Sequence, residues 1–342
     1  MIRCSYNNGK KAGKGDRIFL MGYYLSVDGG GSKTAYLVTD RLGRVCGNYV
    51  TQGCTYSVMG KELVCEILSE GAEAALQMAG ISPDDLIYAV WGISCFGEYE
   101  EMDRCLTGKL SELFPCGMYF CNDVEIGLAG SLLLHFGIHV VAGTGAIVMG
   151  KDKKGKTARA NGWHEDFSDE GSGYWLGLKT LSLFARQADF RERRSFLYEL
   201  VRERCSLGGD MDVVRFYQEN LRGKRKETAA LQEVLLMAAK LGDESAIRLY
   251  DAAAFELAQS VRGVAVQLDL MHEETQVSYC GGIFRCGTFI LNPFSRYLEQ
   301  MGFVLRQPGL PPLGGGILLA ADRDGKQVTE VIENLRKELA AG

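Results

Sequence analysis

The sequence predicts an α/β protein built of two lobes with a cleft between them. Three strand-like segments joined by short turns are followed by alternating helix-like and strand-like segments, which is the pattern of a mixed sheet covered by helices. A glycine-rich turn between two apolar strands occurs near the start and again near the middle of the chain, which indicates one fold used twice. The 342 residues, 46% apolar and 24% charged, suffice for about two domains.

The first lobe is expected over residues 21–122. Period-two patterns predict strands over 23–28, 35–39 and 45–51. Apolar residues at helical spacing predict a helix over 61–79 that ends at Gly80. A strand over 86–93, a helix over 98–114 and a strand over 118–121 complete this lobe.

The second lobe is expected over residues 123–324. A helix over 124–136 leads into a strand, a turn and a second strand over 140–148. From residue 174 the pattern is mostly helical up to residue 270, and strands over 276–280 and 303–306 and a helix over 313–321 follow. An amphipathic helix over 325–342 is expected to pack back on the first lobe.

Charge and composition exclude several classes of partner. The net charge of −5 gives a field that repels nucleic acid and anionic membranes, and no apolar run reaches the roughly 18 residues of a membrane helix. We expect a cytoplasmic protein whose eleven cysteines are mostly small buried hydrophobic residues in a reducing compartment. Residues 1–20 are basic and rich in Gly, Asn and Lys and are expected to form a mobile extension, with Met21 as the natural start.

A carboxylate and a glycine-rich turn follow the first predicted strand. The residues are Asp28 and then Gly29, Gly30, Gly31, Ser32, Lys33 and Thr34. Glycines let backbone N–H groups approach a phosphate closely, and the carboxylate can hold a hydrated Mg²⁺. An ordinary hairpin turn explains the segment equally well, and both the Walker loop and the dinucleotide fingerprint fit it poorly.

Gly143, Thr144 and Gly145 join two apolar strands in the same way. A tight turn explains this second segment when it is taken alone. Two such turns at the heads of two lobes would clamp a polyphosphate from both sides, so the pair is a stronger indication than either turn.

Asn122 and Asp123 lie between the two turns, where a predicted strand ends and a helix begins. An N-cap is one interpretation, because Asp and Asn are favoured there. The other is that Asp123 is a general base for a substrate hydroxyl group. The residues themselves leave both open.

The run from Asn161 to Trp175 combines two of the three tryptophans with four carboxylates. Aromatic faces and fixed carboxylates suit a polyhydroxylated sugar, which needs C–H stacking and acceptors for its hydroxyl groups. Part of the run must be structural, since Ser168 or Asp169 is expected to cap the following helix. Gly281 and Gly282, directly after the strand over 276–280, form a further point of close backbone approach.

Taken in order, these motifs resemble the BadF/BadG/BcrA/BcrD-type ATPase family, which includes N-acetylglucosamine kinases. The resemblance runs from about residue 24 to residue 321 and places the chain in the superfamily of acetate and sugar kinases, heat-shock proteins and actin. It implies two ribonuclease-H-like (actin-like ATPase) lobes that close on Mg-ATP and a sugar. It also implies ATP-dependent phosphorylation of an amino sugar such as N-acetylglucosamine, on its 6-hydroxyl group.

The resemblance further implies roles for single residues. Asp28 would orient Mg²⁺, and Asp123 would be the catalytic base. The phosphates of ATP would be held by Gly29, Gly30, Gly31, Ser32, Lys33 and Thr34 and by Gly143, Thr144 and Gly145, with Gly281 and Gly282 on the adenosine side. The sugar would be contacted by Thr55, Gly162, Trp163 and Asp169.

The sugar-binding positions depart from the family pattern, whereas the phosphate turns keep it. Thr55 stands where the family has an asparagine, and His164 follows Gly162 and Trp163 where a glycine is usual. Ala146 follows the second turn where a serine is usual. The resemblance therefore leaves the identity of the amino sugar open, and it is compatible with a homodimer.

Two other functions compete with an amino-sugar kinase. One is an ATPase that activates a CoA-ester dehydratase or reductase, but its relatives carry a Gly-Gly-Gln-Asp stretch, whereas Ile283 and Phe284 follow Gly281 and Gly282. The other is a nucleotide-dependent sugar sensor without turnover. An intact base at Asp123 favours turnover over sensing, because a binding protein has no need of it.

Overall fold

The structure of the protein is a computed structural model, which describes residues 22–55, 59–272 and 274–339. The predicted N-terminal extension and Met21 lie outside these residues. The chain forms two compact units: unit 1 ends at Asp123 and resumes at Gly316, and unit 2 runs from Val124 to Gly315. Within the described residues, no helix is long and apolar enough to cross a membrane.

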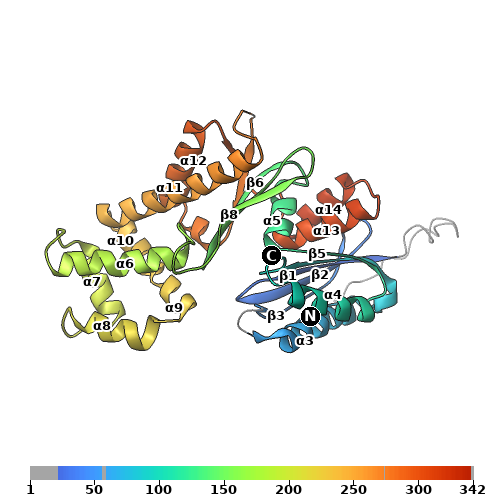
Figure 1. Ribbon diagram of the computed structural model, residues 1–342, viewed down its shortest axis with the longest axis horizontal. Helices are drawn as coiled ribbons and strands as arrows, with labels where there is room; N and C mark the ends of the chain where they lie inside the picture. The colour runs from blue at the N-terminus through green and yellow to red at the C-terminus, as the bar shows by residue number, and fades with distance from the viewer. Residues whose placement is uncertain (1–21, 56–58, 273, 340–342) are drawn as a thin grey trace. The chain divides into compact units, whose positions relative to one another are not determined.

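Unit 1 is built on a five-stranded mixed sheet in the order β3-β2-β1-β4-β5. The strands are β1 (Tyr23–Gly29), β2 (Lys33–Asp40), β3 (Val45–Gln52), β4 (Leu86–Ile93) and β5 (Gly117–Cys121). Strands β1, β2 and β3 are antiparallel neighbours, and β4 and β5 extend the sheet in parallel from β1. The helical elements are α3 (Lys61–Ala79), η1 (Pro83–Asp85), α4 (Glu100–Leu113) and α14 (Thr329–Leu339). In Figure 1, α3 and α4 lie on one side of this sheet and α14 on the other.

The C-terminal segment returns to the first sheet through side-chain hydrogen bonds. The Tyr24 hydroxyl donates to Asp324 Oδ2 at 2.6 Å, and Arg41 Nε donates to the same oxygen at 3.1 Å. Asn334 Nδ2 donates to the carbonyl of Leu42 at 2.9 Å. These bonds explain why residues 316–324, expected in the second lobe, lie in unit 1.

Unit 2 repeats the topology of unit 1. Its sheet has the order β10-β9-β6-β7-β8, with β6, β7 and β8 antiparallel and β9 and β10 parallel to β6. The strands are β6 (Gly137–Ala142), β7 (Ala146–Lys151), β8 (Thr157–Asn161), β9 (Gln276–Cys280) and β10 (Val304–Leu305). The prediction of an α/β protein in which one fold is used twice is therefore confirmed, and both lobes are ribonuclease-H-like.

The helices of unit 2 form its large hydrophobic core together with the sheet. Long helix α11 (Glu244–Gln267) begins at Asp243, which caps it by accepting from the N–H groups of Ser245 and Ala246, and packs on β7 and β8 (Figure 1). The other helical elements are α5 (Asp123–Ser131), α6 (Gly173–Ala188), α7 (Phe196–Arg204), α8 (Asp212–Phe216), η2 (Tyr217–Leu221), α9 (Arg225–Ala230), α10 (Gln232–Lys240), η3 (Gly282–Cys286) and α12 (Thr288–Gln300). Helix α13 (Pro312–Arg323) begins in unit 2 and belongs to unit 1 from Gly316 onward.

Helix α5 is shorter than the helix predicted over 124–136. It ends at Ser131, because Leu133 and Leu134 adopt positive φ angles of 53° and 67°. The N–H groups of Gly309 and Leu310 donate to the carbonyls of Ser131 and Gly130 at 2.9 and 3.0 Å. A distant segment therefore satisfies the carbonyls that a longer helix would have used itself.

Helices α5 and α13 approach each other at a pair of glycines. A Cβ at Gly315 would overlap the carbonyl of Ile126 and the N–H of Gly130, and a Cβ at Gly130 would lie 2.9 Å from the nitrogen of Gly315. The glycine run at 314–316 thus includes a packing site between two helices within unit 2. A ligand is not needed to explain the glycine at position 315.

We expect Gly315→Ala to lower the free energy of unfolding by about 1–3 kcal/mol, because the added methyl group forces the two helix backbones apart. Urea unfolding followed by circular dichroism measures the change. Gly108→Ala is the matched control, since Gly108 lies inside α4 with open space around a Cβ. The control should raise stability by about 0.5–1 kcal/mol through helix propensity, and equal effects of the two variants would contradict the packing role.

Candidate nucleotide and sugar site

The first glycine-rich turn connects β1 to β2 and is fixed at its base by three backbone hydrogen bonds. The N–H of Gly30 donates to the carbonyl of Lys33 at 3.1 Å, the N–H of Ser94 to the carbonyl of Gly29 at 2.8 Å, and the N–H of Cys54 to the carbonyl of Gly30 at 3.1 Å. Gly31 and Ser32 at the tip are exposed, and their N–H groups have no partner among the described residues. A rigid turn with free N–H groups can bind an anion.

Asp28 is half-buried where β1 reaches this turn. Burial raises the pKa of Asp28 to about 6, against the opposing effect of the Lys33 ammonium group. A nearby cation stabilises the ionised form of a carboxylate that burial has deprived of water. Asp28 therefore fits a Mg²⁺ ion that keeps most of its water and is held through one carboxylate and ligand phosphates. The described residues contain no cluster of three or more His, Cys, Asp or Glu side chains that could hold a metal by itself.

The buried thiol of Cys54 lies within electrostatic range of both predicted functional carboxylates of unit 1. Burial is the main cause that raises the pKa of the Cys54 thiol to about 11; the Thr34 side chain opposes the rise, and the charges of Asp123 and Asp28 contribute to it. A Cβ at Gly29 would lie 2.7 Å from Cys54 Sγ. Asp28 and Asp123 therefore both lie near Cys54, a residue to which the sequence alone assigned no role. Asp123 is the first residue of α5.

Thr55 lies beside the first turn. A Cβ at Gly31 would be 3.1 Å from Thr55 Oγ1, and a Cβ at Gly53 would overlap the carbonyl of Gly31. The segment after β3 thus packs directly against the glycines of the turn. The structure places Thr55, predicted as a sugar contact, within reach of a ligand held by that turn.

The second glycine-rich turn connects β6 to β7 and is closed by the N–H of Gly143, which donates to the carbonyl of Gly145 at 2.9 Å. Helix α6 begins on this turn: the N–H groups of Gly173 and Tyr174 donate to the carbonyls of Gly143 and Thr144 at 2.8 and 3.1 Å. The N–H groups of Thr144 and Gly145 take no partner within the described part of the chain. The second turn is therefore built like the first.

Gly281 ends β9 next to the second turn. Its φ is +107°, and a Cβ there would overlap the backbone of Ala142, the last residue of β6. Gly282, by contrast, has open space around a Cβ. The fold therefore requires glycine at position 281, whereas Gly282 leaves room beside the turn.

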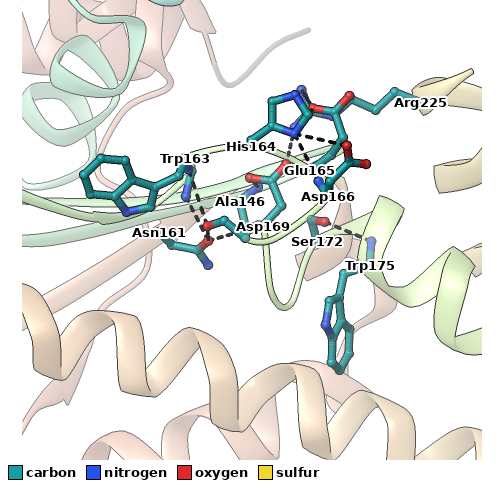
Figure 2. Close-up of polar contacts among 12 residues, drawn as sticks. Ala146, Asn161, Trp163, His164, Glu165, Asp166, Asp169, Ser172, Trp175 and Arg225 are labelled. Atoms are coloured by element: carbon teal, nitrogen blue, oxygen red, sulfur yellow. Dashed lines mark hydrogen bonds and ion pairs between the residues drawn. The ribbon is translucent and has the colours of Figure 1, made fainter. Parts of the chain in front are cut away.

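The loop after β8 is organised by the side chain of Asn161, which sequence reasoning did not single out (Figure 2). Its Oδ1 accepts from the N–H of Gly162 at 2.8 Å, the hydroxyl of Ser168 at 2.8 Å and the N–H of Asp169 at 2.7 Å. Its Nδ2 donates to the carbonyl of Glu170 at 3.0 Å. One buried amide thereby fixes both ends of the loop that carries the predicted sugar contacts.

Asp169 is held in place by protein partners on both carboxylate oxygens. Oδ1 accepts from the N–H of Ala146 at 3.3 Å, and Oδ2 is contacted by Nη2 of Arg225 (Figure 2). Burial still raises the pKa of Asp169, although Arg225 opposes the rise. The expected helix cap is supplied instead by Ser172, whose Oγ accepts from the N–H of Trp175 at 3.1 Å. Arg225 is, after Cys54 and Asn161, a third residue that the sequence pattern did not reveal.

Trp163 offers an aromatic face at the surface of unit 2. It is 73% exposed, and the guanidinium of Arg159 lies 5.6 Å from the centroid of its ring. A pocket of about 350 Å³ lies against the same loop, lined among others by Phe167, Glu170 and Trp175. Aromatic rings and carboxylates thus lie together in this part of unit 2, as the sequence pattern predicted.

The predicted site residues form two groups, one in each unit. Unit 1 brings together the metal and base candidates with the first turn and Thr55. In unit 2 the second turn contacts Asp169 and lies next to Gly281, and Gly162 packs on Ala146 and Ile147 of β7. Each group contains one glycine-rich turn with free N–H groups and carboxylates, which are the kinds of group that phosphate and hydroxyl chemistry needs.

Two curated relatives are similar over most of their length. One is the N-acetylmuramic acid/N-acetylglucosamine kinase of Clostridium acetobutylicum, 28% identical over 281 residues that cover 82% of this chain and 91% of the relative. The other is the N-acetyl-D-glucosamine kinase of Dictyostelium discoideum, 26% identical over 269 residues that cover 76% of this chain and 84% of the relative.

The fold is also that of a solved structure from Chromobacterium violaceum, a protein with a provisional assignment as an N-acetylglucosamine kinase. It matches with a TM-score of 0.70 and 24% identity over 88% of this chain and 99% of the other. The sequence model of the BadF/BadG/BcrA/BcrD ATPase family matches residues 25–320. The chain therefore belongs to the BadF/BadG/BcrA/BcrD ATPase family.

Proposed function

We propose that this protein is an ATP-dependent kinase that phosphorylates a hydroxyl group of an amino sugar such as N-acetylglucosamine. The observation that carries the proposal is that Asp28 and Asp123 both act electrostatically on Cys54, while Asp28 precedes a glycine-rich turn with free N–H groups. Phosphoryl transfer needs a phosphate cradle, a carboxylate for the metal and a carboxylate for the attacking hydroxyl. The two relatives named as amino-sugar kinases support the choice of acceptor.

In this mechanism Asp123 accepts the proton of the sugar hydroxyl, the 6-hydroxyl in our proposal, as that oxygen attacks the γ-phosphorus in line. Gly31 and Ser32 donate their free N–H groups to phosphate oxygens. Asp28 would hold hydrated Mg²⁺, which when bound neutralises charge on the phosphates. The second turn would bind further phosphate oxygens, with Gly281 and Gly282 on the adenosine side.

Gly162, Trp163 and Asp169 supply the proposed sugar contacts. The exposed ring of Trp163 can stack on the C–H face of the pyranose, and the fixed carboxylate of Asp169 can accept a hydrogen bond from a sugar hydroxyl group. Thr55 would add a hydroxyl group next to the first turn. The proposal includes a cytoplasmic location, where ATP is abundant, and a homodimer remains a prediction of the family resemblance.

Asp123→Asn is expected to lower kcat by about 10²–10⁴-fold, because an amide cannot accept the proton of the attacking hydroxyl. KM for the sugar should change only a few-fold, which a coupled ADP-release assay over a panel of amino sugars measures. Asp84→Asn removes the same charge from an exposed position of unit 1 and should leave both constants unchanged. Equal rates in wild type and Asp123→Asn would remove Asp123 as the base, and absence of sugar stimulation in the wild type would favour the sensor.

Asp28→Asn is expected to raise stability by an amount that depends on pH. Because burial raises the pKa of Asp28 to about 6, above its ordinary value near 3.9, the folded protein binds this proton more tightly than the unfolded chain. The unliganded wild type therefore loses stability as the pH rises through this range. The neutral variant should gain Tm over wild type at about pH 7.5 and gain less at about pH 4.

The same variant should lose the dependence of ADP affinity on Mg²⁺, as measured by calorimetric titration with and without EDTA. A variant that keeps the wild-type Mg²⁺ dependence would place the metal elsewhere. A gain in Tm that is the same at both pH values would contradict the raised pKa.

Gly143→Ala tests whether the second turn binds phosphate, because this substitution should affect ligand binding without affecting stability. A Cβ at Gly143 has open space and its φ lies outside the left-handed region, so Tm should stay unchanged. If the turn carries a phosphate in close contact, the methyl group should weaken ADP binding at least about tenfold. Gly209→Ala, equally open, should change neither quantity, and unchanged ADP affinity in Gly143→Ala would mean that the turn is only structural.

A further inference from the structure

Arg225 is placed on the second glycine-rich turn by two helices that pack closely. It is the first residue of α9, and α9 lies directly on α6, where a Cβ at Gly177 would overlap the carbonyl of Thr228. Helix α6 in turn begins on the turn through the N–H of Gly173, which donates to Gly143. The backbone that carries Arg225 is thus fixed relative to the turn.

The guanidinium group of Arg225 lies over Gly145, where a Cβ would overlap Nη2. Nη2 contacts Asp169 Oδ2, and Nη1 lies 3.9 Å from Glu165 Oε2. Figure 2 shows Arg225 reaching toward this acidic part of the loop. A guanidinium has five N–H donors in a planar fork, so these contacts leave donors for a further acceptor.

The two partners differ in how firmly they are held. The Asp169 side chain is 3% exposed and bonded to Ala146, whereas the Arg225 side chain is 42% exposed. An ion pair that includes such an exposed cation contributes little stability. The cation is therefore the member of the pair that can change partners, while the carboxylate keeps its place.

The surroundings favour an oxyanion as that partner. The free N–H groups of Thr144 and Gly145 lie in the same turn, and a guanidinium beside free backbone N–H groups is a typical site for phosphate or carboxylate. The pairing with Asp169 occupies this site with an internal carboxylate when no substrate is bound.

We propose that Arg225 is the oxyanion-binding residue of this site, exchanging the carboxylate of Asp169 for an oxyanion of the bound substrate. The inference rests on the proposed kinase function and deepens it. The oxyanion has two sources, a phosphate of the nucleotide or a carboxylate substituent of an acidic amino sugar. In either case the exchange releases Asp169 Oδ2 to accept a sugar hydroxyl.

The first test is calorimetric titration with tripolyphosphate in the absence of metal. Arg225→Gln should weaken tripolyphosphate binding about ten- to a hundredfold. Arg225→Lys keeps the charge but not the planar fork of donors, so its affinity should lie between those of the wild type and Arg225→Gln. Asp169→Asn should strengthen binding severalfold, because it removes the competing internal carboxylate. Arg215→Gln, an exposed arginine on α8, is the control and should bind as the wild type does.

The second test compares kcat/KM for N-acetylglucosamine and for an amino sugar bearing a carboxylate. Weaker tripolyphosphate binding with equal loss of kcat/KM for both sugars assigns the nucleotide phosphate to Arg225. A loss confined to the acidic sugar assigns the sugar carboxylate. The inference is overturned if Arg225→Gln has the tripolyphosphate affinity of the wild type and the wild-type kcat/KM for both sugars.

The failure of this inference can be told apart from failure of the proposed function. If wild-type protein phosphorylates no amino sugar, the kinase proposal fails, whatever the titration gives. If wild-type protein is active, and Arg225→Gln changes neither the tripolyphosphate affinity nor kcat/KM for either sugar, the kinase proposal stands and only the role of Arg225 is lost. Arg225→Lys serves where Arg225→Gln does not fold.

Discussion

Close approach of one backbone to another at glycine is the constraint on which both units depend. In unit 1 the segment at Gly53 lies so near the carbonyl of Gly31 that no side chain fits, and in unit 2 Gly281 lies equally near Ala142. Each contact fixes the end of a strand against a glycine-rich turn. The N–H groups that we propose to bind phosphate are therefore held in position without a ligand, which would reduce the entropy cost of ordering a loop on binding.

The two units share a strand order but divide the chemistry. Among the described residues, the helical elements between the third and fourth strands of unit 1 are α3 and η1, whereas unit 2 places α6 through α11 between β8 and β9. The carboxylates near Cys54 belong to the simpler unit. The larger insertion supplies α6, which begins on the second turn, and α9, which brings Arg225 to Asp169. The repeated scaffold thus carries different side chains in its two units because different segments are inserted between its strands.

Buried polar groups organise the loop that carries the proposed sugar contacts. Asn161 satisfies three donors with one oxygen, and Asp169 has partners on both of its oxygens. Since an unpaired buried polar group is costly, these bonds select one conformation of the loop. Trp163 remains exposed beside this fixed frame, so the site combines rigid hydrogen-bonding groups with an accessible aromatic face.

The sequence by itself determined the strands of unit 1, both glycine-rich turns and the repeated fold, because side-chain periodicity and glycine turns are local properties. It did not indicate β8, whose apolar residues are only two alanines and which becomes a strand by pairing with β7. It also placed the end of α5 too late, since residues 309 and 310 cap that helix. Asp28 and Asp123 were predicted as functional residues from their positions at strand ends, and these roles stay predictions. Only the tertiary structure revealed Cys54, Asn161 and Arg225, because the partners of buried polar and charged groups are chosen by packing between distant segments, as with Arg225 and Asp169, which lie 56 residues apart.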